Sequence, residues 1–153
     1  PVDFEAFGLS AMAIPAHKGL LGPQGIGALL VTRDFATQLD PTLEEINDIK
    51  TAVSEAVTNC IVHAYKEKIG KIYISGELCD KNIIKIKIRD TGCGIENVKK
   101  AMEPLFTTKP ELERSGLGFA VMESCCDKVK VSSKVGKGTT VTLTFRFDKK
   151  VLK

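Results

Sequence analysis

The chain has 153 residues, with 22 basic and 19 acidic side chains and a formal net charge of +3. This near balance of charge, together with 6% aromatic residues and no Trp, argues against a nucleic-acid partner. The length and an apolar fraction of 43% predict one folded domain with its own core.

The cysteines and the lengths of the apolar runs indicate where in the cell the protein is located. The five cysteines are odd in number and form no Cys-x-x-Cys pair, which disfavours both a disulfide framework and a zinc site. No apolar run reaches the roughly 18 residues of a membrane-spanning helix. The first residues also lack the order of a signal peptide. We therefore expect a cytoplasmic protein without a membrane partner.

Residues 1–30 differ from the rest of the chain in their density of glycine and proline, which predicts mostly irregular structure. The segment 16–27 resembles the part of class V aminotransferases and cysteine desulfurases in which a lysine forms the Schiff base with pyridoxal phosphate. On that resemblance Lys18 would be the cofactor lysine. The match covers only this atypical N-terminal segment, so a pyridoxal enzyme is the least favoured function, and residues 31–153 are taken as the functional domain.

Helices are predicted next. Residues 28–39 are compatible with a short helix, and Pro41 suits the first position of a second one. Thr42 and Glu45 have the spacing of a capping box. An apolar stripe at three- and four-residue steps then predicts a helix of roughly six turns. Its members are Leu43, Ile46, Ile49, Val53, Ala56, Val57, Cys60, Ile61 and Ala64.

After Gly70 the apolar period changes to two, which predicts strands. The first expected element is a hairpin of residues 72–75 and 84–89, with a turn at 79–82. A short helix at 96–102, a mobile loop at 103–116 and a third helix at 117–126 should follow. A final hairpin is expected from residues 128–133 and 139–147. This order predicts an α+β fold, a two-layer sandwich of a mostly antiparallel sheet with helices on one face.

Three residues have the chemistry of a nucleotide site. Glu55 and Asn59 lie four residues apart and share one helical face. The amide oxygen of Asn59 is a hard ligand of the kind that Mg²⁺ takes beside phosphate oxygens, and Glu55 could act as a base toward a hydroxyl nucleophile. Asp90 ends a predicted strand just before Gly92 and Gly94, where it could accept a hydrogen bond from the exocyclic amine of adenine.

Two further motifs agree with this interpretation. Gly116 and Gly118 stand at the start of a predicted helix, where free N–H groups favour phosphate. Thr139 or Thr140 could hold the adenine edge together with Asp90. Each motif is weak alone, because Asp-Thr-Gly also forms ordinary turns and most helical glutamates are simply solvated. Their agreement predicts an ATP site.

The same motifs carry a family resemblance. Over residues 31–153 the sequence resembles the GHKL ATPase/kinase superfamily, with its Bergerat ATP-binding fold. Within it the sequence is similar to the anti-sigma factor serine kinases of sporulation. The matching segments are an N box at 54–59, a G1 box at 90–94, a G2 region at 115–118 and a G3 box at 136–140. The stretch 104–116 matches the ATP lid of this subfamily.

The resemblance implies a homodimer with two protein partners. It would bind and silence a sporulation sigma factor of the F type, and it would phosphorylate a serine of an anti-anti-sigma protein with Mg-ATP. By position, Glu55 would be the general base and Asn59 the Mg²⁺ ligand, and the lid would be a switch between ATP and ADP states. The residues implied to bind ATP are Asn59, Asp90, Gly92, Gly94, Thr107, Thr108, Lys109, Arg114, Ser115, Gly116, Leu117, Gly118, Thr139 and Thr140.

The resemblance fails over residues 1–30, where this family has a strand and one continuous amphipathic helix. Arg33 falls about one turn too late to replace the partner-contacting arginine of that helix. ATP binding should therefore survive more readily than dimerisation or sigma binding. The alternatives are an ATP-dependent sigma-binding module without catalysis, a general-stress anti-sigma kinase, and a histidine-kinase-type ATPase domain. The last of these usually carries Asn where Glu55 stands.

Overall fold

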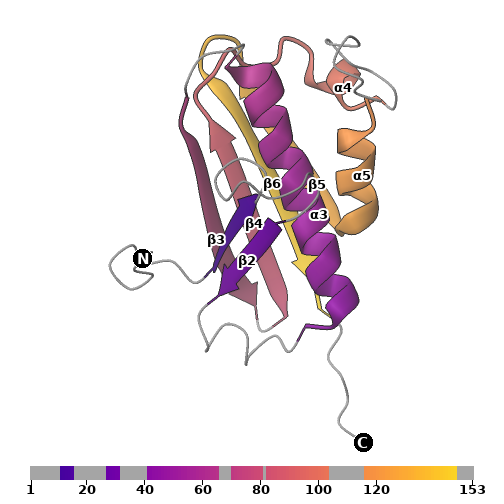
Figure 1. Cartoon of the computed structure of the whole chain (residues 1–153). Helices are drawn as coiled ribbons and strands as arrows, with labels where there is room; N and C mark the ends of the chain where they lie inside the picture. The colour runs from indigo at the N-terminus through magenta and orange to yellow at the C-terminus, as the bar shows by residue number, and fades with distance from the viewer. Residues whose placement is uncertain are drawn as a thin grey trace, which may run out of the picture.

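The computed structural model describes residues 11–15, 27–31, 41–65, 70–80, 82–103 and 116–147. Figure 1 shows these parts as a sheet with helices along one of its faces. In chain order the elements are β1 (Ala11–Pro15), β2 (Gly27–Val31), α3 (Leu43–Asn59), the π-helical turn η1 (Cys60–Ala64), β3 (Ile72–Asp80), β4 (Ile83–Asp90), α4 (Val98–Ala101), α5 (Gly118–Cys125), β5 (Lys128–Lys134) and β6 (Gly138–Arg146). None of the helices in these ranges has the length and apolar character needed to span a bilayer.

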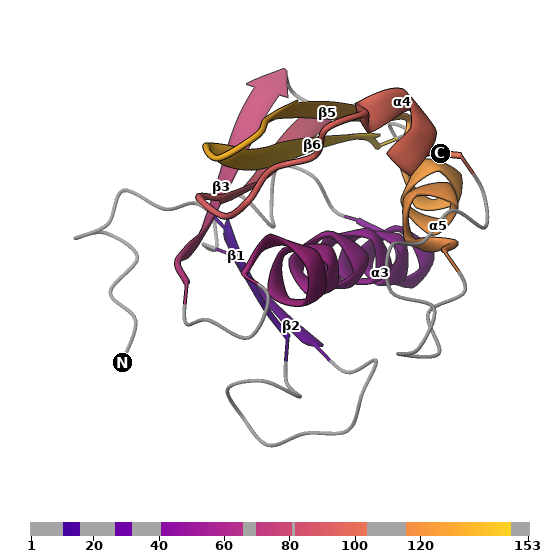
Figure 2. The same cartoon turned by 90° about the horizontal axis from the view of Figure 1, so that it is seen from above.

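The main sheet has four antiparallel strands in the order β3-β4-β6-β5. Every second residue of β4 is buried, whereas Lys85 and Lys87 between them are exposed. The helices α3 and α5 cover the apolar face (Figure 2), so the predicted α+β sandwich with a mostly antiparallel sheet is confirmed. The largest fully buried side chains of the core are Ile84, Ile88, Met122, Leu143 and Val53.

The start of α3 contains the predicted capping box. Thr42 Oγ1 accepts a hydrogen bond from the N–H of Glu45 at 3.1 Å, and Glu45 Oε2 accepts one from the N–H of Thr42 at 2.6 Å. Thr42 is therefore the N-cap, and Pro41 lies outside the helix rather than at its first position. Glu44 and Glu45 place negative charge in the first turn, where the helix dipole favours it.

The predicted second helix has the expected span but differs at its two ends. Leu43, assigned to the apolar stripe, is 72% exposed, and the buried residues of α3 begin at Ile49. The last predicted turn is π-helical, from Cys60 to Ala64. A stripe at three- and four-residue steps cannot distinguish an α-turn from a π-turn over so few residues.

The other predicted elements are present with small shifts at their ends. The first hairpin is formed by β3 and β4, and its turn is shorter than residues 79–82 because β3 continues to Asp80. The helix predicted at 96–102 is α4, and the one at 117–126 is α5. The strands β5 and β6 form the final hairpin. The loop predicted at 103–116 falls mainly outside the described residues.

A second, two-stranded sheet pairs β1 with β2 in antiparallel register. It lies beside α3 (Figure 2). The prediction of mostly irregular structure in residues 1–30 is therefore wrong for these segments, and the helix predicted at 28–39 is wrong over 28–31. A short apolar run suits a strand as well as a helix, and its pairing partner decides between them. Residues 1–10, 16–26 and 32–40, with Lys18 and Arg33, lie outside the described residues.

The capping box gives a stability prediction. Replacing Thr42 by Ala removes the acceptor for the N–H of Glu45, so the free energy of unfolding should fall by about 1 kcal/mol. Thr51→Ala is the matched control, because Thr51 is exposed within α3 and caps nothing. Urea denaturation followed by circular dichroism measures both variants. Equal midpoints for the two variants would show that the capping box contributes nothing.

Candidate nucleotide-binding site

The predicted nucleotide motifs meet at one end of the main sheet, where α3 and β4 end and α5 and β6 begin (Figure 1). A Cβ atom at Gly118 would lie 3.2 Å from Glu55 Oε2 and 3.4 Å from both amide atoms of Asn59. The N box is therefore in contact with the first turn of α5. A Cβ atom at Gly138 would collide with the backbone of Asp90, so the G3 box packs directly on the G1 box.

Asp90 is the most buried charged residue that the structure describes, with 2% of its surface exposed. Its Oδ1 accepts hydrogen bonds from the N–H of Gly92 at 2.8 Å and from the N–H of Thr139 at 3.2 Å. Its Oδ2 accepts a weaker one from the thiol of Cys60 at 3.6 Å. A carboxylate has about four acceptor positions, so the capacity to accept a bond from an adenine amine remains.

Thr139 and Thr140 lie on opposite faces of the sheet. Thr139 is buried beside Asp90, and its hydroxyl lies 2.9 Å from the hydroxyl of Ser133. Ser133 also accepts a hydrogen bond from the N–H of Ile95 at 2.7 Å, which fixes the end of the G1 segment. Thr140 pairs in register with Arg89, on the face away from Asp90. Of the two threonines, Thr139 is therefore the one that shares a face with the carboxylate.

The two glycines after Asp90 are required by packing inside the protein. A Cβ atom at Gly92 would collide with the carbonyl group of Ala64 at the end of η1. Gly94 has a φ of +74°, a left-handed conformation that favours glycine, and a Cβ atom there would collide with the carbonyl of Lys134. Both positions hold the loop against neighbouring elements, which sequence reasoning had not suggested.

Glu55 and Asn59 lie half-buried on the face of α3 that meets Gly118. Among the described residues, neither side chain makes a hydrogen bond. In the described ranges, no cluster of three or more His, Cys, Asp or Glu side chains could hold a metal by itself. A single amide oxygen beside phosphate oxygens is a set that suits Mg²⁺, so Asn59 fits the predicted role.

The G2 region is described only from Gly116 onward. Gly116 has a φ of +67°, and Leu117, which is 37% exposed, is the N-cap of α5 without a side-chain capping bond. Within the described part of the chain, no side chain caps the first N–H groups of this eight-residue helix, as a phosphate-binding helix end requires. The predicted lid residues Thr107, Thr108, Lys109, Arg114 and Ser115 lie outside the described residues, and their roles remain predictions.

Cys60 takes part in the site although its sequence position marked it only as a core residue. Burial raises the pKa of its thiol to about 12, and the negative charge of Asp90 adds to this rise. The thiol therefore stays protonated and can donate to Asp90 at neutral pH. No sequence signal links Cys60 to Asp90, because the contact spans 30 positions in the chain.

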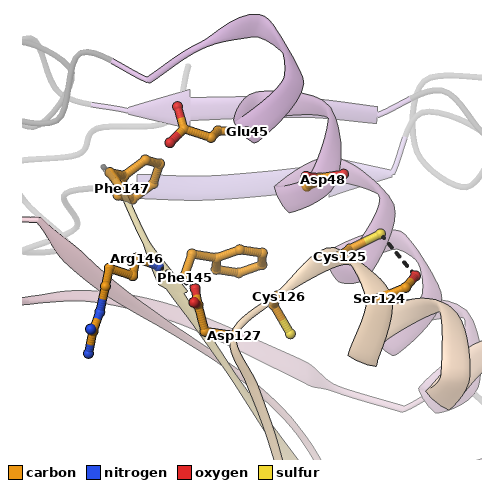
Figure 3. Close-up of a pocket in the computed structure, with 9 residues that line it drawn as sticks. All are labelled: Glu45, Asp48, Ser124, Cys125, Cys126, Asp127, Phe145, Arg146 and Phe147. Carbon is orange, nitrogen blue, oxygen red and sulfur yellow. Dashed lines mark hydrogen bonds between the residues drawn. The ribbon is translucent and has the colours of Figure 1, made fainter. Parts of the chain in front are cut away.

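A separate pocket of about 300 Å³ lies at the other end of α3 (Figure 3). It is formed where the first turns of α3 meet the last turn of α5 and the end of β6. Its lining residues are Glu45, Asp48, Ser124, Cys125, Cys126, Asp127, Phe145, Arg146 and Phe147. None of the residues predicted to bind ATP lines this pocket, so it is distinct from the nucleotide site.

The fold and the family model define the class of this protein. Residues 24–145 match the model of the histidine kinase-like ATPase domain. A histidine kinase domain from the Erythrobacter litoralis EL346 blue-light activated histidine kinase has the same fold, with a TM-score of 0.54 and 21% identity over 68% of this chain and 45% of that one. The structure is thus that of a histidine kinase-like ATPase domain, which is an ATP-binding domain.

Two relatives narrow the family. An anti-sigma F factor of Caldanaerobacter subterraneus subsp. tengcongensis is 59% identical over 117 residues, which is 76% of this chain and 81% of the relative. An anti-sigma F factor of Clostridium acetobutylicum is 52% identical over 120 residues, 78% of this chain and 83% of the relative. The chain belongs to the anti-sigma F factor family within the GHKL superfamily, and the resemblance predicted from the sequence is confirmed.

The buried thiol predicts a pH dependence of stability. The pKa of Cys60 rises from an ordinary 9.0 to about 12 on folding, so between these values the unfolded chain loses a proton that the folded protein keeps. This contribution to stability is fully present below pH 9 and is lost as the pH rises toward 12. Between pH 8 and pH 10.5, ionisation of this thiol in the unfolded chain should lower the unfolding free energy of the parent by about 2 kcal/mol.

Cys60→Ala and Cys60→Ser test this contribution, because neither variant has an ionisable group at that position. Urea titrations at the two pH values give the free energy of unfolding of each protein. This free energy should fall more in the parent than in either variant, by about 2 kcal/mol. Subtraction cancels the titration of every other group. An equal loss in all three proteins would mean that Cys60 ionises in the folded state as readily as in the unfolded chain.

Proposed function

We propose that this protein is an anti-sigma factor that binds and inhibits a sporulation sigma factor, and that it is also an Mg-ATP-dependent serine kinase. Its substrate would be a serine of an anti-anti-sigma protein. The observation that carries the kinase proposal is the position of Glu55 and Asn59, side by side against the first turn of α5. Support for the sigma partner comes from the relatives, which are named anti-sigma F factors.

The two ends of the proposed site would bind different parts of ATP. Asp90 would accept a hydrogen bond from the amine of adenine, with Thr139 beside it on the same face. The first N–H groups of α5 would bind phosphate oxygens, since no described side chain caps them. Asn59 would contribute one ligand to Mg²⁺, which supplies positive charge that neutralises the phosphates during transfer. The site would thus position the nucleotide between a buried carboxylate and a helix N-terminus.

Glu55 would be the general base of the reaction. It would accept the proton of the substrate serine while the serine oxygen forms a bond to the γ-phosphorus. The bond from that phosphorus to the bridging oxygen breaks, and ADP leaves with the electron pair. Glu55 is half-buried and free of described hydrogen bonds, so it can turn toward a hydroxyl group. Little covalent chemistry is required of the protein beyond positioning and charge stabilisation.

The partner-binding proposal has two further parts. We infer a homodimer, as expected for this family, and we infer that the lid at residues 104–116 changes with the nucleotide and so alters the choice of partner. An ATP-dependent module that binds the sigma factor without catalysis would share the nucleotide site. It would have no need of a base at Glu55, so phosphate transfer distinguishes the two functions.

Transfer of labelled γ-phosphate to a purified anti-anti-sigma protein tests the proposed kinase. Glu55→Gln should lower the rate by at least about 100-fold, because general base catalysis typically contributes this much or more. Asn59→Ala should lower it as well, with weaker Mg²⁺-dependent ATP binding. Glu123→Gln is the matched control, since Glu123 is exposed on the neighbouring helix α5.

The results separate the two functions. Transfer by the parent and by Glu123→Gln, lost in the other two variants, is the expected outcome. Binding of ATP and of the sigma factor without any transfer by the parent would contradict the kinase and favour the non-catalytic module. Transfer that persists in Glu55→Gln would remove Glu55 from the role of base.

A further inference from the structure

Tyr65, the residue that follows η1, connects two segments at the adenine side of the site. Its hydroxyl oxygen accepts a hydrogen bond from the N–H of Thr91 at 3.0 Å and donates one to the carbonyl of Lys71. The hydroxyl of Thr91 lies 3.4 Å from the same oxygen. One phenol group therefore joins the residue after Asp90 to the residue before β3.

The ring of Tyr65 is held in place by its packing. A Cβ atom at Gly70 would collide with three atoms of this ring, so the ring lies directly against the backbone of Gly70. This contact fixes the direction of the side chain, and the hydroxyl group can then select one position for Thr91. A flexible tyrosine would provide a hydrogen bond without fixing the position of its partner.

The residues before Tyr65 hold the next residues of the same loop. The N–H of Cys93 donates to the carbonyl of Ala64 at 2.9 Å, and the thiol of Cys93 donates to the carbonyl of His63 at 3.1 Å. The last carbonyls of a helix have no partner within it, and here the G1 segment satisfies two of them. The end of η1 and Tyr65 after it thus contact the loop at Cys93 and at Thr91, on both sides of Gly92.

We propose that Tyr65 is a positioning residue for adenine recognition. This inference rests on the proposed role of Asp90 toward the adenine amine. Asp90 bonds to the N–H of Gly92, so the direction of its carboxylate depends on the conformation of Thr91 between them. The hydroxyl of Tyr65 binds the N–H of Thr91 and keeps that conformation. Without it, this N–H loses its partner and Thr91 is held less firmly, so the carboxylate is directed less precisely although Thr139 still donates to it.

If Tyr65 had a purely structural role at the end of η1, it would not affect which nucleotide base the site prefers. The two roles differ in selectivity between ATP and inosine triphosphate, whose base carries a carbonyl oxygen where adenine carries the amine. A structural defect weakens the binding of both nucleotides alike. A misplaced Asp90 weakens the binding of ATP more, because only ATP has the amine that would donate a hydrogen bond to Asp90.

Tyr65→Phe is the test variant, because it removes only the hydroxyl group. Tyr73→Phe is the matched control, since the chain has two tyrosines and Tyr73 is 51% exposed on β3. Dissociation constants for ATP and inosine triphosphate are measured by calorimetry, together with the urea midpoint of each protein. We expect Tyr65→Phe to weaken the binding of ATP about three- to tenfold and the binding of inosine triphosphate less, which lowers the preference for ATP. Tyr73→Phe should keep both constants.

The outcomes distinguish this inference from the proposed function. A parent that prefers ATP, with the same preference in Tyr65→Phe, overturns the role of Tyr65 and leaves the ATP site intact. Equal weakening of both nucleotides also overturns it, in favour of a structural role. A parent that binds the two nucleotides equally overturns the assignment of Asp90 to adenine, and the role of Tyr65 with it.

A second measurement uses Tyr65 itself and does not depend on the folding of Tyr65→Phe. The chain has no Trp, so in Tyr73→Phe the emission of tyrosine comes from Tyr65 alone. Binding of ATP at the loop that this residue holds should change its emission, with a midpoint equal to the calorimetric dissociation constant. Unchanged emission at saturating ATP overturns the inference.

Discussion

The hydrogen bonds to the carboxylate of Asp90 are the constraint on which the end of this sheet depends. A buried charge is costly unless it is fully hydrogen-bonded, and Asp90 is 2% exposed. Its donors come from three places in the chain: the loop after β4, the start of β6 and the beginning of η1. Each of these segments therefore contributes to the stability of the buried carboxylate. The same hydrogen bonds direct the carboxylate within the proposed adenine site.

The proposed catalytic side of the site depends on the close approach of two helices. Gly118 lets the backbone of α5 come within contact of Glu55 and Asn59, so that the helix N-terminus and the two side chains share one space. A side chain at Gly118 would crowd the ends of both side chains. The proposed adenine side depends on hydrogen bonds to one carboxylate, whereas the proposed phosphate side depends on the absence of a side chain at Gly118.

Local pattern predicted the parts of this structure that local forces determine. The capping box and the alternation in β4 follow from spacing within one element, and both were confirmed. The stripe of α3 was confirmed from Ile49 to Val57, whereas Leu43 at its start is exposed. The pairing of β1 with β2 was missed because strand pairing depends on residues far away in the chain. For the same reason the sequence did not distinguish Thr139 from Thr140 before the register was known, and it did not connect Cys60 to Asp90.

The π-helical turn at Cys60–Ala64 has a consequence for how this site can vary between proteins. A π-turn encloses one more residue than an α-turn, so it shifts the angular phase of everything that follows it. The N box before the turn and the residues that hold the G1 segment after it therefore face directions that are set separately. Deleting one residue here would restore a regular helix while the second group keeps its direction, whereas the same deletion within α3 would rotate that group by about 100°. The π-turn is thus a place where the chain can gain or lose one residue while both halves of the proposed site keep their orientation.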